Sequence, residues 1–335
     1  DRDPTEPLFQ PGRCLAHFAV DPDLVQVTTR LEGEDTRFLP FNRGKHGGAG
    51  NPPVMEGYAT AYLWERIWAK DSVLNLIQHF VHEIEERDDD GRRTGEKQII
   101  FPRYHQLDTV RRLVDDAEEK GPGERYLVAH SAGSGKSFSI GWLAHQLSVL
   151  HDENDERVFD SVIVITDRRV LDRQLQRTVR QFEQTRGMVE NIDETSRQLR
   201  DALEAGKNIV VATLHKFHYV DLAHEIEQMP GNRFAVIVDE AHSSQTGEMK
   251  KSLQSVLATD DLEEAEATDA EAEEGVEDHL IEEMKARGPQ PNVSSFAFTA
   301  TPKQKTLELF GTERPDGQYE PFASYTMRQA IEENF

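Results

Sequence analysis

The segment LVAHSAGSGKSFSIGWLAHQL, Leu127–Leu147, joins a short apolar strand to an apolar helical stretch through a glycine-containing turn. The residues of the turn match a phosphate-binding loop: Gly133, Ser134, Gly135, Lys136 and Ser137. In such a loop the backbone N–H groups point at phosphate oxygens, the lysine binds the β- and γ-phosphates, and the last hydroxyl ligates Mg²⁺. The helix predicted over 137–150 then begins with its positive dipole end at the anion. The pattern predicts a P-loop rather than an incidental Gly-rich turn.

His130 stands where the common G-x-x-x-x-G-K-[ST] pattern has its first glycine. The two glycines of the tight turn are still present, so a side chain at this position is compatible with the loop.

The composition is that of a soluble globular protein, with 37% hydrophobic and 30% charged residues among 335. This length allows more than one structural unit. No apolar run approaches the roughly 18–20 residues of a membrane span, and the start of the chain has no signal peptide. The single cysteine, Cys14, excludes an internal disulfide and favours a cytoplasmic location. Both ends are expected to be cuts in a longer protein.

The net charge of −24 is unusual for a protein that handles nucleic acid. Residues 260–283 contribute 13 acidic residues and no base, and without them the charge is −11 (−24 + 13). Since charges are screened over roughly 8 Å at physiological salt, distant acids do not exclude a local basic groove. The acidic run is interpreted as a solvated insertion. The sharper alternative is a shield against non-specific DNA binding.

The N-terminal third lacks a regular alternation of elements. Residues 14–30 alternate and break at Asp-Pro-Asp, which predicts a hairpin of two strands. Residues 41–53, FNRGKHGGAGNPP, are too rich in Gly, Asn and Pro for a regular element. Apolar residues at helical spacing over 61–84 predict a helix or a helix pair. Residues 85–97 are expected to be a polar surface connection.

From residue 99 onward, short β-branched runs alternate with helical segments. The expected strands are 126–130, 161–167, 208–214, 234–240 and 294–302, and the expected helices are 137–150, 169–183 and 193–205. Buried strands separated by helices predict an α/β fold, a parallel sheet with helices on both faces. Ligands in such folds bind at the carboxyl ends of the strands, where the polar residues of this chain lie.

The run AVIVDEAH places Asp239 and Glu240 at the end of a buried strand. A P-loop protein needs an acid to hold Mg²⁺, usually through water, and we assign that role to Asp239. A second group must orient or deprotonate the attacking water, and we assign that role to Glu240. The simpler alternative is a pair of acids that cap the next helix.

Two further motifs are weaker. Gln106 begins an amphipathic helix, and its amide offers a donor and an acceptor that suit the edge of adenine. The alternative interpretation is that Gln106 is an ordinary surface residue without a binding role. The strand FAFTATP ends in Thr299 and Thr301, whose hydroxyls could bond to the acids or to His242 and pass on the nucleotide state. A threonine pair at a strand end is otherwise ordinary capping.

These elements in this order resemble the first RecA-like domain of superfamily 2 helicases, with DEAH as the second motif. Several other segments resemble the restriction (motor) subunit of type I restriction-modification enzymes: PLFQPGRCLAHFAVD, QVTTRLEG, FLPFNRGKHGGAGNPP, GYATAYLWERI, FPRYHQLDTVRRL and FAFTATPK. The resemblance covers nearly the whole chain.

The resemblance implies a division of the chain. Residues 1–40 would be the C-terminal part of the endonuclease domain, and 41–97 a connector. Residues 98–325 would be the first RecA-like domain with an acidic insertion at 258–287, and 326–335 would begin the link to the second motor domain. The family's nuclease residues, an Asp, a Glu-x-Lys pair and a Gln-x-x-x-Tyr, would precede residue 1. With these residues and the second domain's arginine finger outside the sequence, this segment alone is expected to be weakly active or inactive.

The resemblance also implies a function: translocation of double-stranded DNA, fuelled by ATP with Mg²⁺, in a complex with methyltransferase and specificity subunits. Expected DNA contacts lie after two strands, at Arg168, Arg169, Arg173, Thr213 and Lys216. Their alternative is a solvated basic face. Two other functions stay open: another DEAH-type helicase or remodeller, for which a preference for RNA would speak, and a docking module that needs no nucleotide.

Overall fold

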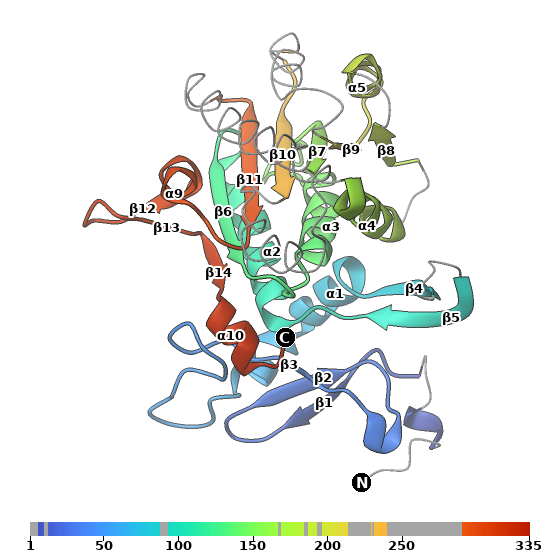
Figure 1. The fold of residues 1–335 in the computed structure, drawn as a ribbon, viewed down its shortest axis with the longest axis vertical. Coiled ribbons are helices and arrows are strands. Elements are labelled where there is room, and N and C mark those ends of the chain that lie inside the picture. The colour runs from blue at the N-terminus through green and yellow to red at the C-terminus, as the bar shows by residue number, and fades with distance from the viewer. Residues whose placement is uncertain are drawn as a thin grey trace, which may run out of the picture.

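The computed structural model describes residues 6–9, 13–87, 93–166, 169–183, 187–192, 196–213, 229, 231–239 and 290–335. Its centre is a seven-stranded sheet in the order β14-β6-β11-β10-β7-β9-β8 (Figure 1). All neighbouring strands in it run parallel. The strands are β6 (Arg125–His130), β7 (Ser161–Thr166), β8 (Val189–Ile192), β9 (Ile209–Thr213), β10 (Phe234–Asp239), β11 (Val293–Thr299) and β14 (Ala323–Tyr325).

Helices cover both faces of this sheet because successive strand residues point to opposite sides. In β7, for example, Val162 and Val164 join one hydrophobic cluster and Ile163 and Ile165 join the other. The first cluster is completed by α2 (Tyr104–Lys120), α3 (Lys136–Leu147) and α4 (Arg169–Gln181), and the second by α5 (Ser196–Glu204) and α9 (Gln304–Phe310). The predicted fold class, α/β with a parallel sheet flanked by helices, is confirmed.

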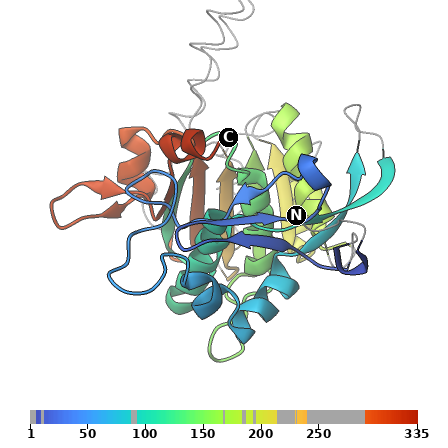
Figure 2. The same cartoon turned by 90° about the horizontal axis from the view of Figure 1, so that it is seen from below.

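The N-terminal part lies below the carboxyl edge of the sheet (Figures 1 and 2). The predicted hairpin is present as β1 (His17–Val20) and β2 (Val25–Thr28), and β3 (Leu39–Pro40) adds a third antiparallel strand. Short helical turns lie at Pro7–Phe9, Gly33–Asp35 and Leu63–Ile67, followed by α1 (Lys70–His79). Phe41 stacks edge-on against Tyr104 of α2, so this part shares its core with the main sheet.

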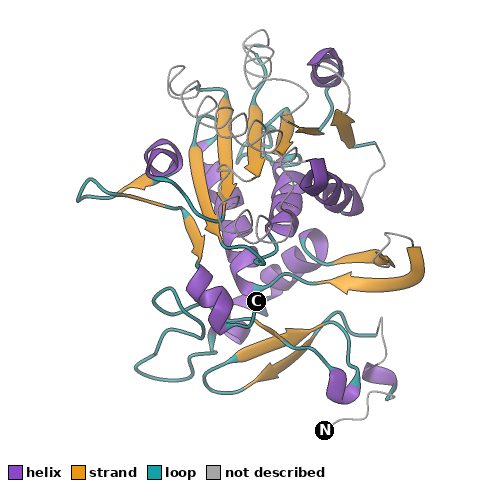
Figure 3. Ribbon diagram, in the orientation of Figure 1, coloured by secondary structure: helices purple, strands orange, loops and turns teal. Residues whose placement is uncertain are grey.

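The expectations for residues 61–97 were partly wrong. The helical stretch ends at His79, and β4 (His82–Arg87) pairs with β5 (Arg93–Ile100) where a continued helix and then a polar connection were predicted (Figure 3). Val81 and Ile84 fit helical spacing, but His82 and Ile84 also alternate with charged residues, which is a strand pattern. The His82 ring stacks on Phe182 at 4.1 Å, so tertiary packing favours the strand.

The C-terminal segment after α9 adds a small hairpin, β12 (Thr312–Glu313) with β13 (Tyr319–Glu320), then β14 and α10 (Met327–Glu332). The edge strands β8 and β14 were not predicted from the sequence, because runs this short carry no distinguishable period. Within the described part of the chain, no helix is long and apolar enough to cross a membrane.

Candidate nucleotide-binding site

The predicted P-loop joins β6 to α3 at the carboxyl edge of the sheet. Gly133 and Gly135 both have φ +77°, a backbone conformation that costs other residues free energy. Gly135 is the N-cap of α3, so the helix begins at Lys136 with its unpaired N–H groups facing the loop. A Cβ at Gly135 would lie 2.4 Å from Gln106 Nε2. Position 135 therefore requires glycine for two reasons: the backbone angle is positive, and Gln106 leaves no space for a Cβ.

Gln106 holds the loop through its side-chain amide. Its Nε2 donates to the carbonyl oxygens of Ser134 at 3.0 Å and Gly135 at 3.1 Å, and its Oε1 accepts from the N–H of Arg103 at 2.8 Å. Both amide hydrogens thus have acceptors in the loop. In this conformation only one lone pair of Oε1 remains for another ligand, such as the adenine predicted from the sequence.

Two hydroxyl groups in the loop suit a phosphate ligand. The Oγ atoms of Ser131 and Ser134 are buried and have no hydrogen-bond partner among the described residues. Buried polar atoms without partners are costly, so such atoms in a loop of this geometry fit a bound anion. The loop residues are therefore compatible with the phosphates of a nucleotide.

His130 lies beneath the loop, fully buried. Its Nε2 is 3.2 Å from Thr109 Oγ1 on α2, and its ring contacts those of His105 and Phe298. Burial, and secondarily the positive charges of Lys136 and Arg103, lower the pKa of His130 to about 3. The side chain that replaces the usual glycine is thus a buried, neutral group that packs against α2 and β11.

We predict that acid destabilises the protein partly through His130. In the unfolded chain its pKa is near 6.5, whereas the folded site resists protonation down to about 3. Between these values the unfolded state binds more protons, so the free energy of unfolding falls as the pH falls below 6.5. Through His130 alone, the free energy of unfolding should fall by about 1.4 kcal/mol when the pH is lowered from 7.5 to 5.5.

Urea unfolding at the two pH values measures this loss. His130→Asn should lose about 1.4 kcal/mol less than the unmodified protein. His151→Asn, the same substitution at an exposed position, is measured in parallel as the control. An equal loss in His130→Asn and the unmodified protein would contradict the assignment.

Asp239, from the second predicted motif, lies at the same edge of the sheet as the P-loop. Across adjacent strands, Asp239 pairs with Phe298, and Thr299 pairs with Ala129, next to His130. Two strand spacings put Asp239 about 10 Å from the end of β6. Asp239 is 7% exposed. Its carboxylate and the hydroxyl of Ser137, in the first turn of α3, are oxygen ligands of the kind Mg²⁺ prefers.

The other predicted site residues are placed incompletely. Glu240, His242, Arg168 and Lys216 lie outside the described residues. For three more, the structure gives only the backbone: Arg169 and Arg173 on α4, and Thr213 at the end of β9. Thr299 is buried in β11, and Thr301 is exposed just beyond it.

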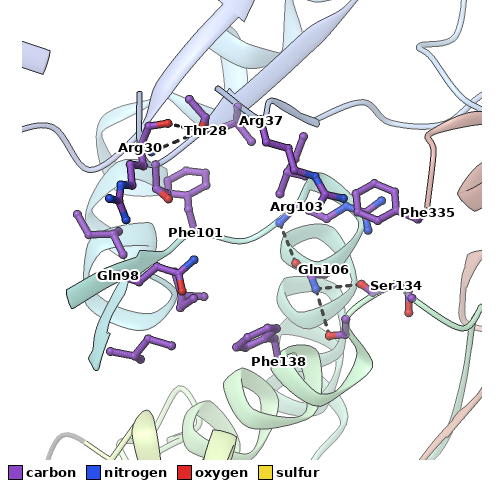
Figure 4. A pocket seen from close by; sticks show the side chains of 18 of the residues that line it. Thr28, Arg30, Arg37, Gln98, Phe101, Arg103, Gln106, Ser134, Phe138 and Phe335 are labelled. Atoms are coloured by element: carbon purple, nitrogen blue, oxygen red, sulfur yellow. Dashed lines mark hydrogen bonds between the residues drawn. The ribbon is translucent and has the colours of Figure 1, made fainter. Parts of the chain in front are cut away.

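A cavity of about 580 Å³ opens beside the loop, between it, the β4–β5 hairpin and the N-terminal sheet (Figure 4). Its lining includes residues that were not predicted: Thr28, Arg37, Gln98, Phe101, Arg103 and Phe138. The N-terminal residues carried no motif that would have marked them. Arg103 and Phe138 lie three residues before Gln106 and two after Lys136, so adjacency to these motifs was the available signal.

The family model of the SWI2/SNF2 ATPases matches residues 105–262. The endonuclease subunit of the type I restriction enzyme HindI from Haemophilus influenzae is 31% identical over 275 residues, which are 78% of this chain and 22% of that protein. The chain is a relative of type I restriction enzyme endonuclease subunits. A subunit of the same kind from Staphylococcus aureus, SauMSSORF170P, is 30% identical over 155 residues, 46% of this chain and 16% of that protein.

The chain therefore spans about a fifth of the length of these endonuclease subunits. A solved fragment assigned to an HsdR subunit of a type I restriction enzyme from Vibrio vulnificus aligns with 96% of this chain and 54% of its own length, at 17% identity and a TM-score of 0.38. The relationship rests on the sequence matches. The P-loop lies within the residues that are similar to SWI2/SNF2 ATPases.

Proposed function

We propose that this chain is part of a type I restriction endonuclease subunit and that it uses ATP hydrolysis to translocate double-stranded DNA. The observation that carries the proposal is the register that sets the P-loop and Asp239 at the same edge of one parallel sheet. The restriction enzyme relatives support the biological context. The partners in this proposal are duplex DNA and the methyltransferase and specificity subunits, and the location is cytoplasmic.

In this proposal the loop residues bind and orient the triphosphate. Lys136 and the loop N–H groups stabilise negative charge on the phosphates, and Ser137 and Asp239 hold Mg²⁺, Asp239 through water. Mg²⁺ held by these residues would supply positive charge against the charge that develops on the phosphoryl group. Glu240 positions the attacking water.

Contact with DNA is assigned to the strand ends that follow β7 and β9. There the cationic and hydroxyl side chains of Arg168, Arg169, Arg173, Thr213 and Lys216 would bind backbone phosphates without selecting a sequence. His242, Thr299 and Thr301 would couple hydrolysis to this contact. Selection of the DNA site would belong to another subunit.

The deciding experiment measures ATP hydrolysis by the intact protein with linear duplex DNA, single-stranded DNA or duplex RNA, alongside triplex displacement on the duplex. Duplex DNA is expected to give the strongest stimulation and displacement of the third strand. Stronger stimulation by RNA would favour another DEAH-type motor. Absence of nucleotide binding would favour a docking module.

We predict that Asp239→Asn weakens the use of Mg²⁺. Removing the charge of a carboxylate that acts through bound water should lower Mg²⁺-dependent turnover by about 10- to 100-fold. Nucleotide binding in EDTA should be unchanged, because the phosphate contacts of the loop remain. Titration of hydrolysis with Mg²⁺ tests this, and Asp160→Asn, which removes a surface ion pair with Arg233, is the control. An unchanged Mg²⁺ requirement would remove Asp239 from the site.

A further inference from the structure

A buried ion pair joins the beginning of α2 to the end of the chain. Arg103 Nη2 lies 2.8 Å from Glu333 Oε2, and the two side chains are only 7% and 4% exposed. Tyr325 completes the cluster, because its hydroxyl accepts from Arg103 and donates to the same carboxylate oxygen at 2.8 Å. Gln329 Nε2 donates to the other oxygen at 3.0 Å. Each oxygen of the buried carboxylate therefore has donors, which a charge in this position requires.

The same cluster is connected to the P-loop by short steps. The N–H of Arg103 fixes Gln106, whose amide holds the carbonyls of Ser134 and Gly135 (Figure 4). The His105 ring stacks on Tyr325 at 3.9 Å, and its Nε2 lies 3.0 Å from the same Ser134 carbonyl. A carbonyl only accepts, so Nε2 carries a proton in this bond.

A third connection is made by the backbone. The N–H of Ser131 donates to the carbonyl of Tyr325 at 2.9 Å, at the point where β14 lies beside β6. The loop is thus held at Ser131 by Tyr325 of the cluster, and at Ser134 and Gly135 by His105 and Gln106, which lie two and three residues after Arg103.

The Gly-rich loop, residues 41–53, fixes α10 in the position that this cluster needs. Thr326 donates from its hydroxyl to the carbonyl of Gly47, and the N–H of Ala49 donates to Glu332 Oε2 at 2.7 Å. A Cβ at Gly48 would lie 2.5 Å from Glu332 Oε2. One at Gly44 would lie 2.9 Å from Gln329 Oε1. The small residues of the loop leave room for the side chains of α10.

We infer that Arg103 and Glu333 are positioning residues for the nucleotide-binding loop, and that the Gly-rich loop is the receptor that holds α10 for this purpose. The conformation of the P-loop then depends on the segment that follows β14. The part of the inference that concerns ATP affinity rests on the proposed function. Its structural part, that the ion pair sets the mobility of residues 131–135, does not.

The test uses the intact protein and two variants that act on the cluster from different sides. Glu333→Gln keeps the size of the side chain and removes its charge. Gly48→Ala adds one methyl group against Glu332, far along the chain from the P-loop, at a position without a positive φ. Gly231→Ala is the matched control, because Gly231 has no positive φ and no atom of the described residues within 4 Å of its added Cβ.

The first measurement is hydrogen–deuterium exchange without nucleotide. Both variants should exchange faster in the peptide covering 131–137, while β7 and β9 stay as protected as in the unmodified protein. The dissociation constant of a fluorescent ATP analogue should rise by about tenfold, the effect of one charge-assisted hydrogen bond. Gly231→Ala should change neither quantity.

Unchanged exchange at 131–137 in both folded variants would overturn the inference. Faster exchange throughout the sheet would also overturn it, because the ion pair would then support the fold as a whole. If the unmodified protein binds no nucleotide, the proposed function fails while the exchange result still decides whether the ion pair positions the loop.

Discussion

Lys136→Ala is expected to abolish measurable ATP turnover while leaving the protein folded. The lysine is the first residue of α3 and directly follows the left-handed Gly135. In the proposed site its charge would lie beside the bound phosphates. Loss of a charge-assisted contact of about 1.5–3 kcal/mol should weaken nucleotide binding by about 10- to 100-fold. Loss of a group that stabilises the developing charge should lower turnover by a further 10² to 10³, approximately.

The measurement is fluorescent Mg-nucleotide binding together with hydrolysis at saturating ATP. Lys120→Ala is the matched control, because Lys120 is the last residue of α2 and forms an ion pair with Asp116. Near-normal binding and turnover by Lys136→Ala would show that the loop does not bind nucleotide as proposed. Loss in both variants would indicate a general effect on the fold.

Gly135→Ala is expected to cost both stability and nucleotide affinity. An alanine at φ +77° is strained by roughly 1–2 kcal/mol. Its Cβ would also displace Gln106, whose lost hydrogen bonds add about 1–3 kcal/mol. Because a shift of about 1 Å in a binding group can cost 10²-fold, nucleotide affinity should fall by about that factor.

A double-mutant cycle separates the two causes. Gly206→Ala carries the backbone strain alone, since Gly206 has φ +68° and, in the part of the chain that the structure describes, nothing within 4 Å of an added Cβ. In a Gln106→Ala background, Gly135→Ala should cost no more stability than Gly206→Ala does. Chemical unfolding of the single and double variants provides the energies. If Gly135→Ala costs as much stability in the Gln106→Ala background as in the unmodified protein, the contact between the added Cβ and Gln106 does not contribute.

The parallel sheet was predictable from the sequence because each central strand is apolar on both faces. Runs such as Val162–Ile165 have no polar position, and only a strand covered by helices on both sides buries all of it. The P-loop was predictable because its chemistry is local: the glycines, the lysine and the serine are consecutive. The position of Asp239 at the end of a buried strand was predictable because the acid directly follows an apolar run.

The remaining features depend on contacts between distant segments. Gln106 was predicted to face adenine, and no local pattern shows that its amide is bound to carbonyls 28 and 29 residues away. The partner of Arg103 lies 230 residues further along the chain. A single sequence gives no sign of such pairings, because any buried acid could satisfy the arginine. The strand at 82–87 was missed because Val81 and Ile84 also fit helical spacing, and the contacts that favour the strand, its pairing with β5 and the stacking of His82 on Phe182, join segments separated in the sequence.

The position of β14 has a mechanical consequence. This strand of three residues lies parallel to β6, with Tyr325 opposite His130 at the entrance to the P-loop. A pull on the chain beyond β14 would load its bonds to β6 in shear, where they resist together, rather than opening them one at a time. The α10 contacts with the Gly-rich loop would take up part of the same load. Tension in the segment that leaves the sheet would therefore act directly on the nucleotide-binding loop.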